Sequence, residues 1–224
     1  DRVGRMRKIL DAHGIECCML GLWGWNFLSA DEAESEEARR MLDRAIEFGA
    51  MLGARIFVTG TGKIPEASLP EQTAAFVEMF KPRMEKIEEV DMQCALFPLH
   101  GASFITGVEA YEAIWEHLPQ IGIKFDPANW SHQGHDYVDV VRRYGDRISH
   151  VHIKEHLYHE GELVAQPAAG MGDIQWGKVM AFLYEHDFDG YLSMEPHGPI
   201  WSKGDMRRRM LMLSQRYIQQ FMIE

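Results

Sequence analysis

The sequence has 224 residues, of which 46% are hydrophobic and 25% charged, an ordinary composition for one large globular domain. Its formal net charge of −11 at pH 7 argues against a nucleic-acid partner, because phosphate binding needs clustered Lys and Arg. No apolar run reaches the roughly 20 residues that span a bilayer, and no secretory leader opens the sequence. The 3 cysteines are too few for a disulfide framework. We therefore expect a cytoplasmic protein with no membrane or nucleic-acid partner.

Helical and strand-like segments alternate along the chain. The first predicted helix ends near His13, and a capping box at Ser68–Glu71 opens the third. The other predicted helices cover residues 31–52, 108–117, 136–144, 173–185 and 206–222. Asp173 is the predicted cap of the helix that ends at residue 185. The predicted strands cover residues 15–20, 55–59, 93–99, 122–126, 148–154 and 191–195. Mostly apolar strands separated by helices are typical of a parallel sheet that is covered on both faces.

This alternation predicts one α/β domain over residues 1–224, a (β/α)8 TIM barrel. A closed barrel needs eight strands and the sequence shows six, so we expect roughly the first two βα units to be absent. The chain begins with Asp1 rather than Met, which agrees with an N-terminally incomplete barrel. An open doubly wound sheet is the alternative. It normally binds dinucleotides through a G-x-G-x-x-G turn, and the run from Thr59 to Gly62 lacks the third glycine.

Three predicted strands end on residues that can bind a divalent metal: Asp126, His152 and Glu195. In a parallel barrel, functional side chains gather at the carboxyl ends of the strands. Each residue alone has an ordinary explanation, namely a turn or cap before Pro127, a core histidine and a surface carboxylate. Their shared position on three strands predicts a metal site. Oxygen and imidazole ligands suit Mn²⁺, Mg²⁺, Co²⁺ or Zn²⁺.

Four segments carry a resemblance to a known family. They are residues 125–129 (FDPAN), 150–155 (HVHIKE), 170–174 (GMGDI) and 190–195 (GYLSME). Together they resemble the consecutive signatures of the xylose-isomerase-like TIM barrels, which include sugar isomerases and epimerases, inosose dehydratases and type IV apurinic endonucleases. The resemblance implies one divalent ion held by a Glu, an Asp, a His and a Glu on the last four strands.

Three of those four ligands match Asp126, His152 and Glu195. By the same resemblance, Glu195 is also a catalytic acid/base. The first glutamate is replaced by Pro98, which removes one half of a two-carboxylate epimerase machinery. His100, two residues further on, is a candidate substitute metal ligand or proton-transfer group. It could equally hydrogen-bond the substrate or cap the following loop.

Other polar and aromatic residues are candidates for the same site. Lys154 could stabilise an oxyanion or bind a substrate carboxylate or phosphate, and its structural alternative is an ion pair with Asp126 or Glu155. The candidate substrate-binding residues follow predicted strands, where loops often contact ligands. They are Trp25, Asn129, His132, His135 and His197. Their alternatives are a solvated loop or, for the tryptophan, packing.

The sequence thus predicts a metal-dependent isomerase or epimerase that abstracts a proton next to the carbonyl of a sugar or sugar derivative. The runner-up is an inosose-dehydratase-like lyase, which also begins with an enolate but expels water. A non-catalytic sugar-binding barrel is the third hypothesis, because Pro98 replaces the usual carboxylate. We expect a small-molecule, sugar-type substrate and a possible homo-dimer.

Overall fold

The structure is a computed structural model that describes residues 2–98 and 101–223. Its contacts divide the chain into two compact units, one up to Lys124 and one from Phe125 onward. No helix in the described part of the chain is long and apolar enough to span a membrane.

The first unit is built on parallel strands that pair in chain order. These strands are β1 (Met19–Leu22), β2 (Ile56–Thr59), β3 (Gln93–Leu96) and β4 (Gly122–Phe125). Met19 pairs with Ile56, Ile56 with Gln93, and Ala95 with Gly122. All residues of β2 and β4 are buried, as expected for strands covered on both faces.

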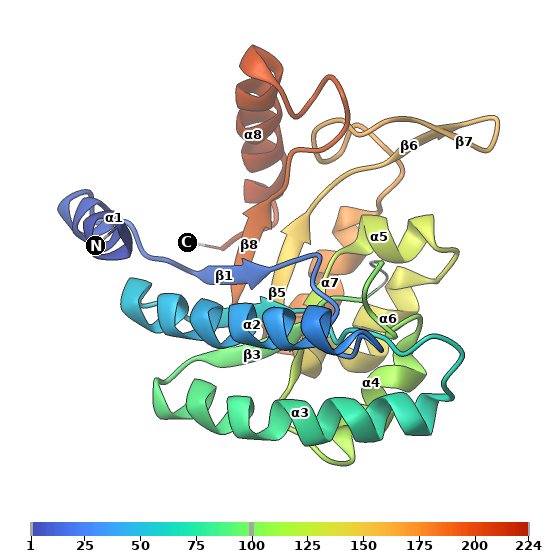
Figure 1. Cartoon of the computed structure of the whole chain (residues 1–224). Coiled ribbons are helices and arrows are strands. Elements are labelled where there is room, and N and C mark those ends of the chain that lie inside the picture. Colours follow the sequence, from blue (N-terminus) through green and yellow to red (C-terminus); the bar gives the residue numbers. More distant parts are fainter. Residues whose placement is uncertain (1, 99–100, 224) are drawn as a thin grey trace. The chain divides into compact units, whose positions relative to one another are not determined.

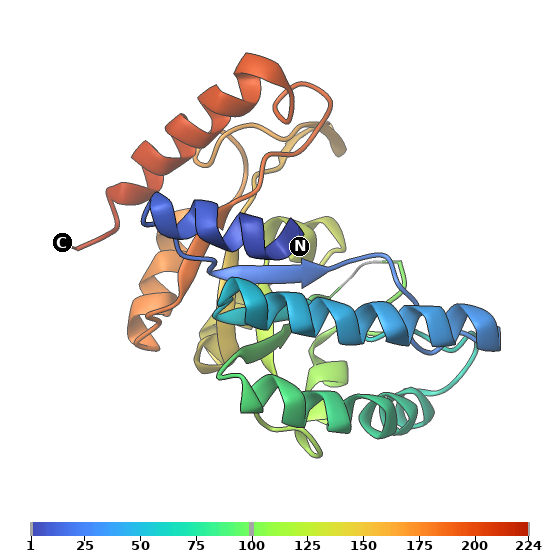
Figure 2. The ribbon, with the colours of Figure 1, turned by 60° about the vertical axis from the view of Figure 1, so that its left-hand side comes forward.

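Helices flank these strands, and two of them lie along the sheet. They are α1 (Arg2–Ala12), α2 (Glu32–Leu52), α3 (Leu69–Glu89) and α4 (Val108–Trp115). The two long helices α2 and α3 lie side by side in both views (Figures 1 and 2). The carboxylate of Asp31 caps α2 by accepting the Glu34 N–H, and Gly53 ends that helix at a φ of 65°.

The second unit contains β5 (Ile148–Ile153) and β8 (Tyr191–Met194), which pair in parallel with His152 opposite Ser193. Its helices are α5 (Pro127–His132), α6 (Tyr137–Tyr144), α7 (Trp176–Glu185) and α8 (Gly204–Gln219). Between β5 and α7, the strands β6 (Leu157–His159) and β7 (Glu162–Ala165) form an antiparallel hairpin that projects beyond the end of β5 (Figure 1). Glu160 and Gly161 both have positive φ, which is the backbone of a tight two-residue hairpin turn.

The predicted alternation of helices and parallel strands is confirmed, with differences in detail. The first strand begins at Met19, later than predicted, so Cys17 and Cys18 precede it. The predicted strand over residues 93–99 ends at Leu96. The loop predicted after Asp126 is instead the short helix α5.

The predicted cap of the next-to-last helix is also corrected. Helix α7 begins at Trp176, three residues after Asp173. The Asp173 carboxylate accepts the backbone N–H of Tyr158 instead, at 2.7 Å. It therefore fixes the start of the β6–β7 hairpin rather than the start of the helix.

Candidate metal centre

Asp126 lies at the junction of β4 and α5 and serves two local purposes. Its Oδ1 accepts the Asn129 N–H at 3.1 Å, which caps the first turn of α5. Pro127 follows at the first helical position, where its missing N–H costs nothing. The side chain of Asp126 is 1% exposed. The role of Asp126 as a helix cap, weighed as its structural explanation, is therefore present.

Asp126, His152 and Glu195 come together in the second unit. One ligand atom from each residue lies within 4.8 Å of the other two. His152 lies in β5, and Glu195 directly follows β8, where its N–H donates to the Ile153 carbonyl at 3.0 Å. His152 Nδ1 and Glu195 Oε2 are 3.0 Å apart.

The donor set of this cluster fits a divalent ion. Two carboxylates and one imidazole are ligands that Zn²⁺ and Mn²⁺ accept, and a fourth position for water or substrate is typical of a catalytic site. Asp126 and His152 are buried and Glu195 is partly exposed, so solvent reaches the cluster at Glu195. Such an arrangement can hold an ion while one ligand stays within reach of a substrate.

Lys154 brings a positive charge to the same cluster. Its Nζ donates to Asn129 Oδ1 at 2.5 Å and lies 3.6 Å from Asp126 Oδ2 and 4.0 Å from Glu195 Oε2. The Lys154 side chain is only 5% exposed. The ion pair with Asp126 that was weighed as a structural alternative is therefore present, and it is made with a candidate metal ligand.

Glu155 binds a different set of partners. It holds in place the segment between β5 and α7 that carries the β6–β7 hairpin, which we call the excursion. Its carboxylate accepts the backbone N–H groups of His156, Gly170 and Ile174 and the indole N–H of Trp176, at 3.0 to 3.1 Å. Burial raises the pKa of Glu155, which these N–H donors partly offset. Both ends of the excursion are thus held by one buried side chain.

The remaining candidate residues of the second unit fall into different settings. His197 Nε2 lies 3.2 Å from Glu195 Oε1, which places it beside the candidate acid/base. His132 Nδ1 hydrogen-bonds the Tyr158 hydroxyl of the hairpin at 2.7 Å. The ring of His135 contacts the Trp130 ring edge-on, with centroids 5.2 Å apart, so His135 has a packing contact.

Three positions belong to the first unit or lie outside the described residues. Trp25 is partly exposed in the first unit. Pro98 is buried just after β3. His100, the candidate substitute ligand, lies outside the described residues, so its suggested role stays a prediction.

One buried polar residue next to the cluster escaped the sequence reasoning as a site residue. His156 is 2% exposed, and its Nε2 lies 3.0 Å from the Gln166 amide nitrogen. Burial lowers the pKa of His156 to about 4, and the Lys154 ammonium adds to this effect. Its place directly after the HVHIKE run could have marked it as a site residue. Its burial could not be foreseen, because it depends on the contact with Gln166 further along the chain.

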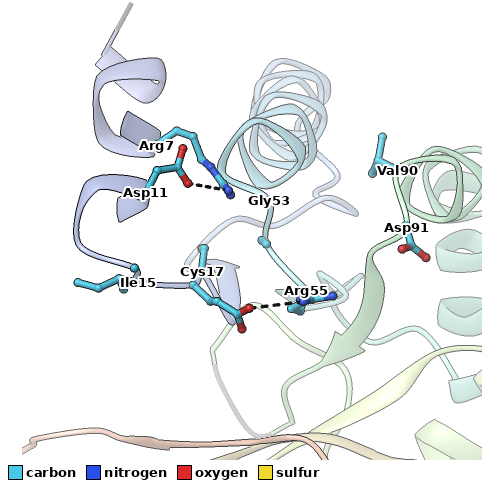
Figure 3. A pocket seen from close by; sticks show the side chains of 11 residues that line it. Arg7, Asp11, Ile15, Cys17, Gly53, Arg55, Val90 and Asp91 are labelled. Carbon is cyan, nitrogen blue, oxygen red and sulfur yellow. Dashed lines mark ion pairs between the residues drawn. The ribbon is translucent and has the colours of Figure 1, made fainter. Parts of the chain in front are cut away.

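A separate pocket in the first unit has the features of a structural crevice. Arg7 and Asp11 form an ion pair one helical turn apart along its wall, and Arg55 pairs with Glu16 (Figure 3). Burial raises the pKa of the Cys17 thiol in its wall, which disfavours the reactive thiolate. The pocket lies where β2 begins, and the amino end of barrel strands generally serves stability.

Comparisons with known proteins agree with the fold. The sequence model of the xylose isomerase-like TIM barrel family matches residues 1–216. A search of curated proteins finds no match.

Solved structures resemble the chain over nearly all of its length. An IOLI protein with a binding zinc atom is 15% identical, with a TM-score of 0.82 over 100% of this chain and 84% of that one. L-ribulose 3-epimerase is 17% identical, with a TM-score of 0.79 and coverages of 98% and 79%. The 3-keto-D-glucoside 4-epimerase YcjR from E. coli is 15% identical, with a TM-score of 0.76 and coverages of 97% and 84%. At such identities the likeness shows the fold.

Proposed function

Because the chain belongs to the xylose isomerase-like TIM barrel family, we propose that it is a metal-dependent isomerase or epimerase of a sugar or sugar derivative. The observation that carries this proposal is the gathering of Asp126, His152 and Glu195 within 4.8 Å. The solved relatives with epimerase names and the zinc-containing IOLI protein support it.

In this proposal, Asp126, His152 and Glu195 hold one divalent ion, with Zn²⁺, Mn²⁺, Mg²⁺ or Co²⁺ as the candidates. The bound ion supplies Lewis acidity that polarises a carbonyl oxygen of the sugar and lowers the cost of negative charge on it. The three ligands are held by β5, β8 and the start of α5, so rigid elements position the ion.

Glu195 moves the proton at the carbon beside the carbonyl. Its side chain is 32% exposed, more than His152 or Asp126, so a substrate can reach its carboxylate. His197 Nε2 lies 3.2 Å from Glu195 Oε1, close enough to orient this carboxylate. Lys154 Nζ lies 4.0 Å from Glu195 Oε2 and supplies a fixed positive charge beside the reacting centre.

Pro98 determines which reaction follows proton abstraction. By family resemblance a glutamate belongs at this position, and it would deliver a proton to the opposite face of the sugar. With Pro98 there, epimerisation needs another acid, for which His100 is our candidate. A lyase reaction can use one group for both proton transfers, because Glu195 can take the proton beside the carbonyl and return it to the hydroxyl that leaves as water. Pro98 therefore keeps the dehydratase alternative open.

Exchange of substrate hydrogen with solvent tests the proposal. Full-length protein, stripped of metal and reloaded with Mn²⁺, is incubated in deuterium oxide with a panel of ketoses and keto-inositols. We expect deuterium next to the carbonyl of at least one compound, detected by NMR. An epimer as product indicates an epimerase, and loss of water from the product indicates the lyase.

Two matched variants make this experiment specific. Glu195→Gln removes the base and should abolish exchange, whereas Glu185→Gln alters an exposed carboxylate at the end of α7 and should preserve it. Exchange that survives in Glu195→Gln contradicts the assigned role. Absence of exchange with every compound, although the ligand panel binds, favours the non-catalytic barrel.

A further inference from the structure

The net charge of the candidate metal centre changes sign when a divalent ion binds. Without the ion, the carboxylates of Asp126 and Glu195 lie 3.6 and 4.0 Å from the ammonium of Lys154, and these three groups are the charges considered below. The centre then carries one negative charge. A divalent ion neutralises both carboxylates and leaves the charge of Lys154 without compensation.

The ammonium group of Lys154 is buried, so solvent cannot compensate its charge. Its side chain is 5% exposed, and the Asn129 amide oxygen satisfies one of its three N–H donors. A buried charge without a counter-charge is strongly unfavourable. The Glu155 carboxylate, next in sequence, is occupied by four N–H donors. The metal-bound centre therefore lacks one negative charge close to Lys154.

The surroundings of Lys154 add hydrogen-bond donors for an anion. His156 is buried, and its Nδ1 has no hydrogen-bond partner among the described residues. The His156 Nε2 accepts from the Gln166 amide, so the neutral ring carries its proton on Nδ1. The His132 ring lies 5.4 Å from the His156 ring between centroids. An unused N–H donor thus lies two residues after Lys154 in the chain.

We infer that Lys154 binds an anionic group of the substrate once the metal is in place, so that the substrate is a sugar acid or a sugar phosphate. The anion replaces the charge that Asp126 and Glu195 give up to the ion. Metal and anion therefore bind cooperatively. This inference rests on the proposed function, because it needs the divalent ion.

Binding measurements test the inference without knowledge of the reaction. The full chain is stripped of metal and titrated with Mn²⁺ by calorimetry. The Mn²⁺-bound and metal-free proteins are then titrated with xylitol, xylonate and xylitol 5-phosphate, which share a carbon chain and differ in charge. Each titration is repeated with Lys154→Met and with Lys178→Met, a control on the exposed face of α7.

We expect the Mn²⁺-bound protein to bind xylonate or xylitol 5-phosphate at least about tenfold tighter than xylitol, because charge-assisted hydrogen bonds are the strong ones. The better of the two ligands identifies the carboxylate or the phosphate. The preference should be absent without metal, absent in Lys154→Met and retained in Lys178→Met. Lys154→Met should also bind Mn²⁺ at least about threefold tighter, since it removes a competing positive charge.

The outcomes separate this inference from the proposed function. Normal Mn²⁺ binding with equal affinity for the three ligands, or with none binding, overturns the inference alone. A preference that survives in Lys154→Met also overturns it. Failure of the wild-type chain to bind Mn²⁺ overturns both. If Lys154→Met does not fold, Lys154→Gln provides the same comparison.

Discussion

Replacement of Glu155 by alanine should destabilise the protein more than replacement of any exposed carboxylate. The wild-type side chain accepts four buried N–H groups, from His156, Gly170, Ile174 and Trp176. A buried donor left without a partner costs about 1 to 3 kcal/mol. Water can enter the space left by the shorter side chain and satisfy part of this set. We therefore expect a loss of about 4 kcal/mol in the free energy of unfolding.

Urea unfolding followed by tryptophan fluorescence and circular dichroism measures this loss. Glu162→Ala, on the exposed strand β7 of the same excursion, is the matched control and should change the free energy by less than about 0.5 kcal/mol. Limited proteolysis near Gly161 should also become faster in Glu155→Ala. If the two variants unfold at the same urea concentration, Glu155 does not hold the excursion and the reasoning is refuted.

Three further changes probe the pKa of a buried histidine and buried hydrogen bonds. His156 has its pKa lowered to about 4 in the folded protein, so the unfolded chain binds more protons below about pH 6.5 and stability falls as the pH drops. Between pH 7 and 4.5 the free energy of unfolding of the wild type should fall by about 2.5 kcal/mol more than that of His156→Gln. The control His159→Gln, on the exposed hairpin, should lose as much as the wild type. Equal losses in all three proteins contradict the assignment to His156. Thr61→Val removes one of the two acceptors of the Phe104 N–H, which also donates to the Gly62 carbonyl, and should cost about 1 kcal/mol in urea unfolding. Tyr111→Phe removes the hydrogen bond to the carbonyl of Leu96 and should cost about 1 kcal/mol, and an unchanged midpoint would show that water replaces it.

The sequence predicted those features that depend on local patterns. Apolar runs and their flanking caps identified the strands, and the ligands lie where these runs end. Asp126, His152 and Glu195 could be grouped because the ends of parallel strands meet at one edge. The structure brings these three residues together.

Contacts between residues that are far apart in the sequence could not be predicted in the same way. Glu155 looked like a partner of Lys154, but its carboxylate accepts N–H groups from residues up to 21 positions away. Asp173 looked like a helix cap because Asp is a common capping residue, and it instead accepts the Tyr158 N–H across the excursion. The hairpin β6–β7 has a two-residue Glu160–Gly161 turn that the sequence reasoning overlooked.

The most direct test of the account is the number and affinity of divalent ions bound by the triad. Metal-free protein is titrated with Zn²⁺ and Mn²⁺ by calorimetry, in the wild type and in Asp126→Asn, His152→Gln and Glu195→Gln. Asp189→Asn, a carboxylate in the turn before β8, is the control. The account predicts one ion per chain, a loss of at least about tenfold in affinity for each triad variant, and none for the control. Wild-type affinity in all three triad variants, or no ion bound by the wild type, would contradict it.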